Sequence, residues 1–374
     1  MKIPLSKPEI TNDDKKEILR VLETSYLSLG PKLKEFEGKI AQYAGVKYAV
    51  GVNSGTAGLH LIIRALGVKE GDEIITTPFS FVSSSNCVIY ERAKPVFADI
   101  ESDTFNINPE FVEGLITPKT KAILAVDVFG HPADWGVLKK IADKHNLFLI
   151  EDSAEALGSE YGGKKCGSFG EAAIFSFYPN KQITTGEGGM VLTNNKEIAD
   201  LCRSMANQGR KSNGGKWLEH IRLGYNYRLD EMSCALGICQ LKRIDQIIKK
   251  REKVARLYND KLKGFPEIEI PCIASGVKLS RFVYVVRLSQ KFSEKERDKI
   301  ISEMSDKGIQ CSNYFYPIHL QPFYKEMFGY KMGDFPICES VSRRTIALPF
   351  FNSITEEEID FVAANLKEII QCFH

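Results

Sequence analysis

The sequence predicts an α/β fold, with a mostly parallel seven-stranded sheet and a smaller C-terminal α+β domain. Two observations lead to this prediction. From residue 48 to residue 193, short apolar strands alternate with helical stretches, and the strands are apolar throughout, as in a sheet covered by helices on both faces. After about residue 245 the strands become fewer and less regular, which indicates a second domain.

The first elements of the chain are helical. Asn12-Asp13-Asp14 precedes an apolar periodic pattern and predicts a capped helix that ends near Glu23. Ser25–Pro31 breaks the pattern, because its glycine and proline favour a turn. The periodicity that resumes after this turn predicts a second helix over Lys32–Tyr43.

The sheet is predicted from short apolar runs that are bounded by polar residues and glycine. The seven strands are expected at Tyr48–Val52, Glu73–Thr77, Pro95–Ala98, Ala122–Val128, Leu147–Ile150, Ala172–Phe177 and Met190–Thr193. Helical patterns fill most of the gaps between them, for example Ala57–Leu66 and Val137–His145.

The C-terminal part begins with a long charged helix, predicted over Asp245–Lys263. A strand at Arg281–Leu288 and helices at Glu294–Lys307 and Thr355–Gln371 follow. We therefore expect a large α/β domain over residues 1–245 and a small domain over residues 246–374.

Composition limits the class of protein. The chain has 374 residues, a net charge of +2 and 43% hydrophobic residues, as expected for a globular protein with a sizeable core. The near-neutral charge gives no sign of a nucleic-acid or membrane partner. The nine cysteines are scattered without metal-ligand or disulfide spacing. With no signal peptide and no apolar run of about 20 residues, the chain is expected to be cytoplasmic, with reduced thiols and no metal.

The segment Asn53–Gly58, NSGTAG, lies between a predicted strand and a predicted helix. Glycine permits a tight turn, and the free N–H groups at a helix start attract an anion, so a phosphate would be held by backbone amides and the Thr56 hydroxyl. The same small residues also serve as a simple helix cap. A P-loop is not indicated, because Gly158–Lys165 lacks the final Ser or Thr.

Two polar residues follow neighbouring apolar strands. Asp152 comes after Leu147–Ile150, and Lys181 comes after Ala172–Phe177, in which Ser176 is placed to meet a phosphate. A pyridoxal 5′-phosphate (PLP) enzyme needs a lysine that carries the cofactor as a Schiff base and an acid that keeps the pyridine nitrogen protonated. Taken alone, such a lysine also simply ends a strand, and such an aspartate also caps a helix.

Longer motifs add a family resemblance that covers nearly the whole chain. In order, these motifs are IPLSKPEI, NSGTAGLHL, EDSAEALGSEYGGKKCGSFG, FSFYPNKQITTGEGGMVLT, LGYNYRLDEMSCALGICQL and YPIHLQPFY. Together they resemble the DegT/DnrJ/EryC1/StrS family of PLP-dependent nucleotide-sugar aminotransferases, within the aspartate-aminotransferase-like fold (PLP fold type I).

The resemblance implies roles around the cofactor. Lys181 would be the catalytic lysine, which binds PLP and moves a proton between the substrate carbon and the cofactor, and Asp152 would pair with the pyridine nitrogen. The phosphate would be held by the amides of Gly55, Thr56 and Ala57 and by the hydroxyl of Ser176. Phe81 would stack on the face of the ring, although core packing is an alternative role for it.

The resemblance also implies substrate residues and an assembly. Arg228 is expected to hold the donor carboxylate or the phosphates of the sugar nucleotide, and His319 and Tyr314 are expected on the substrate side. Asn226 matches a residue that reaches the phosphate from the neighbouring subunit. A homodimer with shared active sites is therefore expected.

Two positions depart from the family pattern. Glu155 stands where most members carry His or Gln against the 3′-oxygen of the cofactor, and a carboxylate beside that oxygen needs a shared proton. Glu at this position resembles the perosamine-synthase type, which aminates C4. Ser312 stands where members often carry Arg, which leaves open how an acidic ligand is anchored.

The expected reaction moves an amino group from L-glutamate, which becomes 2-oxoglutarate, to the keto carbon of a nucleotide-diphospho-keto-deoxysugar. C4 is preferred and C3 is possible, and the product would serve surface polysaccharide, lipopolysaccharide or glycan biosynthesis. One alternative is a sugar 3-dehydratase of the same family. The resemblance implies His at the lysine position in those members, so Lys181 argues against this alternative. The other is a non-catalytic regulator, against which the complete set of Lys181, Asp152 and Ser176 argues.

Overall fold

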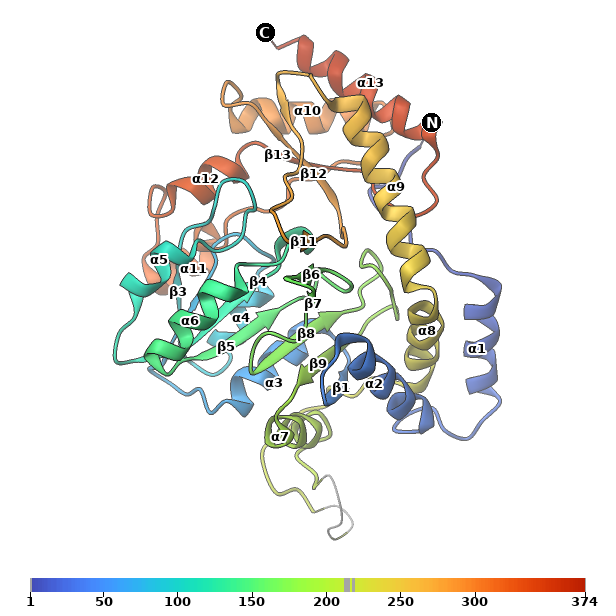
Figure 1. Cartoon of the computed structure of the whole chain (residues 1–374), viewed down its shortest axis with the longest axis vertical. Coiled ribbons are helices and arrows are strands. Elements are labelled where there is room, and N and C mark those ends of the chain that lie inside the picture. Colours follow the sequence, from blue (N-terminus) through green and yellow to red (C-terminus); the bar gives the residue numbers. More distant parts are fainter. Residues whose placement is uncertain (1, 212–215, 217–218, 374) are drawn as a thin grey trace.

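The computed structural model describes residues 2–211, 216 and 219–373, and a seven-stranded sheet lies at its centre (Figure 1). The strands are β1 (Tyr48–Val52), β2 (Glu73–Thr76), β3 (Lys94–Phe97), β4 (Thr120–Val126), β5 (Phe148–Asp152), β8 (Ala172–Ser176) and β9 (Gly189–Thr193). Their order across the sheet is β1-β9-β8-β5-β4-β2-β3. β9 is antiparallel to both of its neighbours, and the other pairs are parallel. The predicted mostly parallel sheet of seven strands is confirmed.

Strand β4 lies two residues before its predicted position at both ends, because it starts at Thr120 and stops at Val126. The apolar run continues into the single turn Val128–Gly130, where Phe129 has a φ of 56°. This left-handed conformation cannot continue a strand. The strand therefore ends before the apolar pattern does, and Asp127 follows its last residue.

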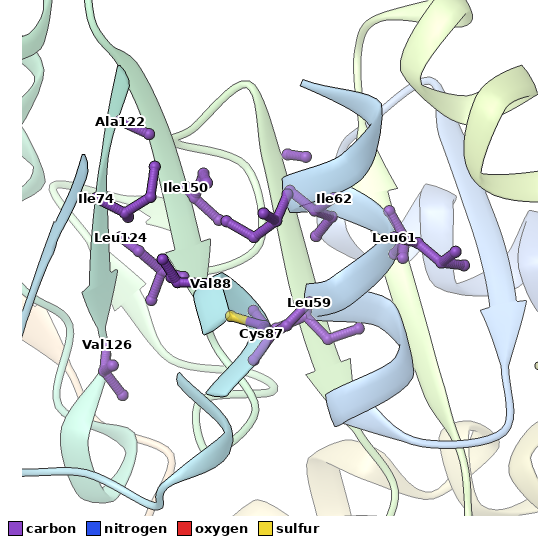
Figure 2. Packing of buried hydrophobic residues seen from close by; sticks show 14 of the residues in the cluster. Leu59, Leu61, Ile62, Ile74, Cys87, Val88, Ala122, Leu124, Val126 and Ile150 are labelled. Atoms are coloured by element: carbon purple, nitrogen blue, oxygen red, sulfur yellow. The ribbon is translucent and has the colours of Figure 1, made fainter. Parts of the chain in front are cut away.

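Helices cover both faces of the sheet. One face is covered by α3 (Gly55–Ala65), α4 (Ser83–Ile89) and α7 (Lys196–Ala206). Figure 2 shows Leu59 and Ile62 of α3 and Val88 of α4 packed near Leu124 and Ile150 of the sheet. The other face is covered by α2 (Pro31–Ala44), α6 (Trp135–His145) and α8 (Glu231–Lys242). Burial on both faces explains why the strands are apolar throughout.

The C-terminal part has its own hydrophobic cluster. It is built on the antiparallel strands β10 (Ile268–Glu269), β12 (Tyr284–Leu288) and β13 (Thr345–Leu348), with helices α9 (Ile244–Leu262), α10 (Glu294–Asp306) and α13 (Glu356–Gln371). Ile3, near the N-terminus, is buried in the same cluster. In Figure 1, α9 runs from α8, beside the large sheet, to α13. The domain boundary near residue 245 stays a prediction.

Smaller elements complete the chain. They are α1 (Asn12–Leu22), α5 (Pro109–Val112), α11 (Pro322–Phe328), α12 (Pro336–Ser342) and a small sheet of β6 (Glu160–Tyr161), β7 (Lys164–Lys165) and β11 (Val277–Lys278). Among the residues that the structure describes, no helix combines the length and the apolar character that crossing a membrane requires.

A distant carboxylate caps the start of α2. Glu231, at the start of α8, is 1% exposed. It accepts hydrogen bonds from the backbone N–H groups of Gly30 (3.0 Å), Lys32 (2.7 Å) and Leu33 (3.0 Å). A Cβ on residue 30 would lie 2.6 Å from Glu231 Oε2, so glycine is required for this close approach. The negative charge also suits the positive end of the α2 dipole.

Replacing Glu231 with Ala removes the acceptor of these three hydrogen bonds. We expect the free energy of unfolding to fall by about 2–4 kcal/mol, because buried N–H groups lose their partner. Urea unfolding followed by circular dichroism measures the change. The matched control is Glu326→Ala on the exposed side of α11, with an expected change below about 0.5 kcal/mol. Equal effects of the two substitutions would contradict the capping role.

Candidate active site

The parallel register of three neighbouring strands brings their carboxyl ends to one edge of the sheet. Asp152, the last residue of β5, pairs with Val126 at the end of β4 and with Ile174 of β8. Ser176 ends β8, and the segment after it carries Lys181. Ligands of such sheets bind outside the carboxyl ends of the strands. This edge is the candidate active site.

The start of α3 and the end of β8 form a cradle for an anion. A Cβ on Gly55 would lie 3.1 Å from Ser176 Cβ and 3.3 Å from Ser176 Oγ, so a larger residue would require Ser176 to move. The Ala57 N–H already donates to Ser54 Oγ, the helix cap, at 3.1 Å. Of the three amides that were predicted to hold a phosphate, those of Gly55 and Thr56 have no acceptor within the helix.

Asp152 is buried (3% exposed) and has hydrogen bonds but no counter-ion. Ser84 Oγ donates to its Oδ2 at 2.7 Å, and the Ala154 N–H donates to its Oδ1 at 3.2 Å. Burial raises the pKa of Asp152 above its usual value, whereas these two donors and the charge of Lys181 lower it. Within the described residues, no basic side chain lies at ion-pair distance from Asp152. Its environment therefore suits a cationic group of a ligand.

Lys181 lies between an acid and an aromatic ring. Its Nζ is 3.5 Å from Glu155 Oε1 and 3.9 Å from the centre of the Phe282 ring. Glu155 Oε2 accepts a hydrogen bond from the Phe129 N–H at 2.8 Å. Burial raises the pKa of Glu155, the Lys181 charge and the Phe129 N–H lower it, and the Asp152 charge raises it. The amine is thus close to a buried proton acceptor and partly screened from water.

Tyr314 connects the C-terminal part to this site. Its ring stacks on those of Phe282 (centroids 6.3 Å apart), Phe129 (6.4 Å) and Phe315 (5.1 Å). Burial raises the pKa of the Tyr314 hydroxyl, and the charge of Glu155 raises it further. The structure therefore brings the predicted residue Tyr314 to Lys181 and Glu155.

Three other predicted residues lie on segments that border the site. Phe81 is 60% exposed, and its carbonyl accepts a hydrogen bond from the N–H of Ser84, the residue that contacts Asp152. The backbone carbonyl of Asn226 accepts from Asn53 Nδ2 at 3.3 Å, just before α3, and its side chain is exposed. Arg228 donates to Asn207 Oδ1 at 3.2 Å.

His319 does not lie where it was expected. It is 0% exposed, and its Nε2 is 3.0 Å from Glu339 Oε1. The Phe335 ring packs against it, with centroids 4.7 Å apart. Burial lowers the pKa of His319, and Glu339 opposes this shift. A side chain without accessible surface contacts only the protein, so the structure gives His319 a packing position rather than a substrate contact.

Sequence reasoning missed several residues that support the site. Ser84 bonds to Asp152, and its only signal was a run of hydroxyl residues after Phe81. Arg251 of α9 donates to the carbonyls of Lys181 (3.1 Å) and Phe282 (3.0 Å), and burial lowers its pKa to about 10. Arg251 lies in a charged run that reads as a solvated helix face, so no local pattern indicated this role.

Comparisons with known proteins agree with this geometry. The model of the DegT/DnrJ/EryC1/StrS aminotransferase family matches residues 8–367. The GDP-perosamine synthase of Escherichia coli O157:H7 is 35% identical over 367 residues, with 98% of each chain covered. PseC of Helicobacter pylori, an aminotransferase involved in the biosynthesis of pseudoaminic acid, is 32% identical with a TM-score of 0.95, over 100% of both chains.

A further structure, the PLP-form of the putative sugar aminotransferase Spr1654 of Streptococcus pneumoniae, is 28% identical with a TM-score of 0.95, and 100% of both chains is covered. Likeness over the whole length of these chains confirms the predicted aspartate-aminotransferase-like architecture, PLP fold type I.

The Lys181→Met variant tests the electrostatics of the site. Burial gives Asp152 and Glu155 raised pKa values in the folded protein, so the folded state binds more protons than the unfolded one and stability falls as pH rises through this range. Lys181 opposes both shifts, and its removal enlarges them. We expect the melting temperature of the variant to fall more steeply than that of the parent as pH rises above the usual carboxyl range.

The control for this experiment is Lys164→Met, at an exposed lysine of β7. Its pH profile should run parallel to that of the parent. A Lys181→Met profile that is also parallel would contradict the assignment of Lys181 as the cation that acts on both acids.

Proposed function

Because the chain belongs to the DegT/DnrJ/EryC1/StrS aminotransferase family, we propose that it is the PLP-dependent enzyme that transfers the amino group of glutamate to C4 of a nucleotide-diphospho-keto-deoxysugar. The observation that carries this proposal is the position of Lys181 Nζ, 3.5 Å from buried Glu155, beside the strand end that holds Asp152. Enzymes of this kind need both a lysine amine and a buried acid at one sheet edge.

The residues present fit the cofactor in three respects. Gly55 leaves the start of α3 open beside Ser176, so that backbone amides and a hydroxyl can meet a phosphate. Asp152 is a buried acid without a counter-ion in the described part of the chain, which suits a protonated pyridine nitrogen. Lys181 carries an amine whose charge acts on Asp152 and which lies 3.5 Å from Glu155. Phe81, exposed beside Ser84, is available to cover the ring.

In this arrangement different residues bind different parts of the cofactor. Gly55, Thr56 and Ser176 would hold the phosphate, Asp152 would keep a proton on the ring nitrogen, and Lys181 would bind the cofactor through Nζ. When bound, PLP supplies an electron sink that lets a substrate carbon lose its proton, and it carries the amino group between two substrates.

Lys181 is the group that moves the proton of the reacting carbon. Its four-carbon stem lets Nζ swing, while Arg251 holds its backbone carbonyl in place. Glu155 Oε1 lies 3.5 Å from Nζ and provides an adjacent site for the proton. The rings of Phe282, Phe129 and Tyr314 exclude water from one side of this pair. General acid–base work of this type contributes about 10²–10⁴-fold to a rate.

The choice of substrates is supported by residues and relatives. Arg228 would bind the carboxylate of glutamate, which leaves as 2-oxoglutarate, or the diphosphate of the sugar nucleotide, because a guanidinium matches both anions. Glu155, at a position where His or Gln is usual, favours the perosamine-synthase type and hence C4. The similarity to a GDP-perosamine synthase and to PseC supports an activated sugar as the acceptor. The aminated sugar would serve surface polysaccharide, lipopolysaccharide or glycan biosynthesis.

The working unit in this proposal is a homodimer with shared active sites, in which Asn226 reaches the phosphate of the partner's cofactor. Its side chain is exposed, as this role requires. Large apolar side chains are also exposed near the site and near the α2 turn, namely Leu223 (66%), Tyr26 (61%) and Phe81 (60%). Their burial between two copies would be favourable.

A trapping experiment tests the cofactor assignment. We expect the purified protein loaded with PLP to absorb visible light and to retain a covalent adduct on Lys181 after borohydride reduction, located by peptide mass spectrometry. Lys181→Ala should lose the adduct and at least about 10²-fold in amino transfer, because no other amine takes its proton-transfer role. Lys164→Ala is the control and should keep both. The absence of an adduct on Lys181 would end the aminotransferase proposal.

A substrate panel tests the regiochemistry. The enzyme is supplied with glutamate and with 4-keto and 3-keto nucleotide sugars, and the products are identified by mass spectrometry. We expect amination of the 4-keto sugars and formation of 2-oxoglutarate in equal amount. Turnover of 3-keto sugars alone would overturn the C4 assignment that rests on Glu155, while leaving the aminotransferase activity in place.

A further inference from the structure

Behind Asp152 lies a group of fully buried polar side chains. Asp127 follows β4, Glu151 precedes Asp152 on β5, and Ser153 follows it. Successive side chains alternate across a strand, so Glu151 and Ser153 point away from the face that Asp152 uses. None of the reaction roles assigned above uses these three residues.

The hydrogen bonds of this group require an extra proton. Ser153 Oγ lies 2.5 Å from Asp127 Oδ2 and 2.8 Å from Glu151 Oε1. A hydroxyl has one hydrogen and can donate it to only one of these oxygens. The other carboxyl group must therefore carry a proton and donate it to Ser153 Oγ.

The remaining donors show which carboxyl group carries it. Both oxygens of Glu151 accept backbone N–H groups, Oε1 from Gly167 and Oε2 from Phe169 at 2.8 Å. Asp127 Oδ1 accepts from the Ala133 N–H and from Trp135 Nε1, both at 2.9 Å. Within the described part of the chain, no N–H group donates to Asp127 Oδ2. The Cys166 thiol also forms a hydrogen bond with Asp127, but a thiol is a weak donor. Asp127 Oδ2 therefore has room for a hydrogen, whereas both Glu151 oxygens already accept backbone N–H groups.

The charges around the group agree with a retained proton. Among described residues, no Lys, Arg or His forms an ion pair with Asp127 or Glu151. The third titratable group is the Cys166 thiol, whose sulfur lies within 4.8 Å of both carboxyl groups, with Glu160 further out. Burial raises the pKa of Asp127 and the charge of Glu151 raises it further, against the hydrogen bonds from Ser153, Ala133 and Cys166. Burial also raises the pKa of Glu151, to about 7, but its backbone donors oppose that shift. Two ionised carboxylates here would lack any compensating cation.

We propose that Asp127 is a neutral, protonated acid that acts as a positioning residue for Asp152. Its Oδ2–H donates to Ser153 Oγ, and the Ser153 hydroxyl donates to the Glu151 carboxylate. The Asp127 N–H also donates to the Asp152 carbonyl at 3.0 Å. The network thus holds Asp152 through its backbone and through both of its sequence neighbours.

A neutral Asp127 has a consequence for the reaction, and this consequence rests on the proposed function. An ionised Asp127 would place another negative charge behind Asp152 and Glu155, and would raise the proton affinity of both. With Asp127 protonated, this effect is limited to Glu151, whose charge is shared among its donors. The proton assignment itself stands on hydrogen-bond geometry and is independent of the activity.

Two near-isosteric variants test the assignment. In Asp127→Asn the amide NH₂ replaces O–H and still donates to Ser153, so the melting temperature should stay within about 2 °C of the parent. In Glu151→Gln an NH₂ group meets the backbone N–H of Gly167 or Phe169, and the melting temperature should fall by about 5 °C. Asp143→Asn, at an exposed acid of α6, is the control and should match the parent.

Two further readouts separate proton storage from simple packing. Because the pKa of Asp127 is raised on folding, the parent loses stability as pH rises above the usual carboxyl range, and Asp127→Asn should flatten this loss. Infrared spectroscopy should show a protonated carboxyl band that persists at neutral pH and disappears in Asp127→Asn. The control Asp143→Asn should show the same dependence of stability on pH as the parent, and the same infrared band.

The positioning role is tested by PLP itself. Asp127→Ala should lose PLP on dialysis under conditions in which Asp127→Asn retains it, as followed by visible absorbance. If Glu151→Gln is tolerated and Asp127→Asn is not, or if the band survives in Asp127→Asn, the assignment is overturned. The melting temperatures and the infrared band do not depend on amino transfer. They therefore test the protonation of Asp127 even if the proposed reaction fails.

Discussion

The active-site edge depends on one buried carboxylate, Asp152, which forms no ion pair with a basic side chain of the described residues. Burial of such a group is unfavourable unless hydrogen bonds and an opposite charge compensate it. Ser84 and the Ala154 N–H supply the hydrogen bonds, and Lys181 supplies part of the charge. In the proposed function, a protonated pyridine nitrogen supplies the rest of the compensating charge. The acid thus stabilises the folded protein best when the cofactor is bound.

Contacts from the large sheet and from the C-terminal part of the chain together hold Asp152 and Lys181 in place. On the large sheet, β5 sits between β4 and β8, so the backbone of Asp152 is fixed on two sides. From the C-terminal part, Arg251 ties the carbonyl of Lys181 to that of Phe282, whose ring lies under the lysine amine. The site is therefore a product of contacts between distant segments and not of one loop.

Much of this arrangement could be predicted from the sequence, and the limits have physical causes. All seven strands of the large sheet were predictable, because strands buried on both faces are apolar along their length. Asp152, Ser176 and Lys181 were indicated because they follow two neighbouring apolar strands and because the motifs around them resemble those of a PLP-dependent family. Arg251 was not, because its partners lie about 30 and about 70 residues away and only the fold brings them together. His319 was misplaced, because a buried partner such as Glu339 leaves no local pattern.

The central claim is that Asp152 is ionised in the loaded enzyme and faces a protonated ring nitrogen. The most direct measurement is the nitrogen NMR shift of PLP that is isotope-labelled in its ring and bound to the protein, recorded across the pH range in which the protein is folded. The account predicts the shift of a protonated pyridine nitrogen throughout this range, and its loss in Asp152→Asn. A shift characteristic of an unprotonated ring in the parent protein would contradict it.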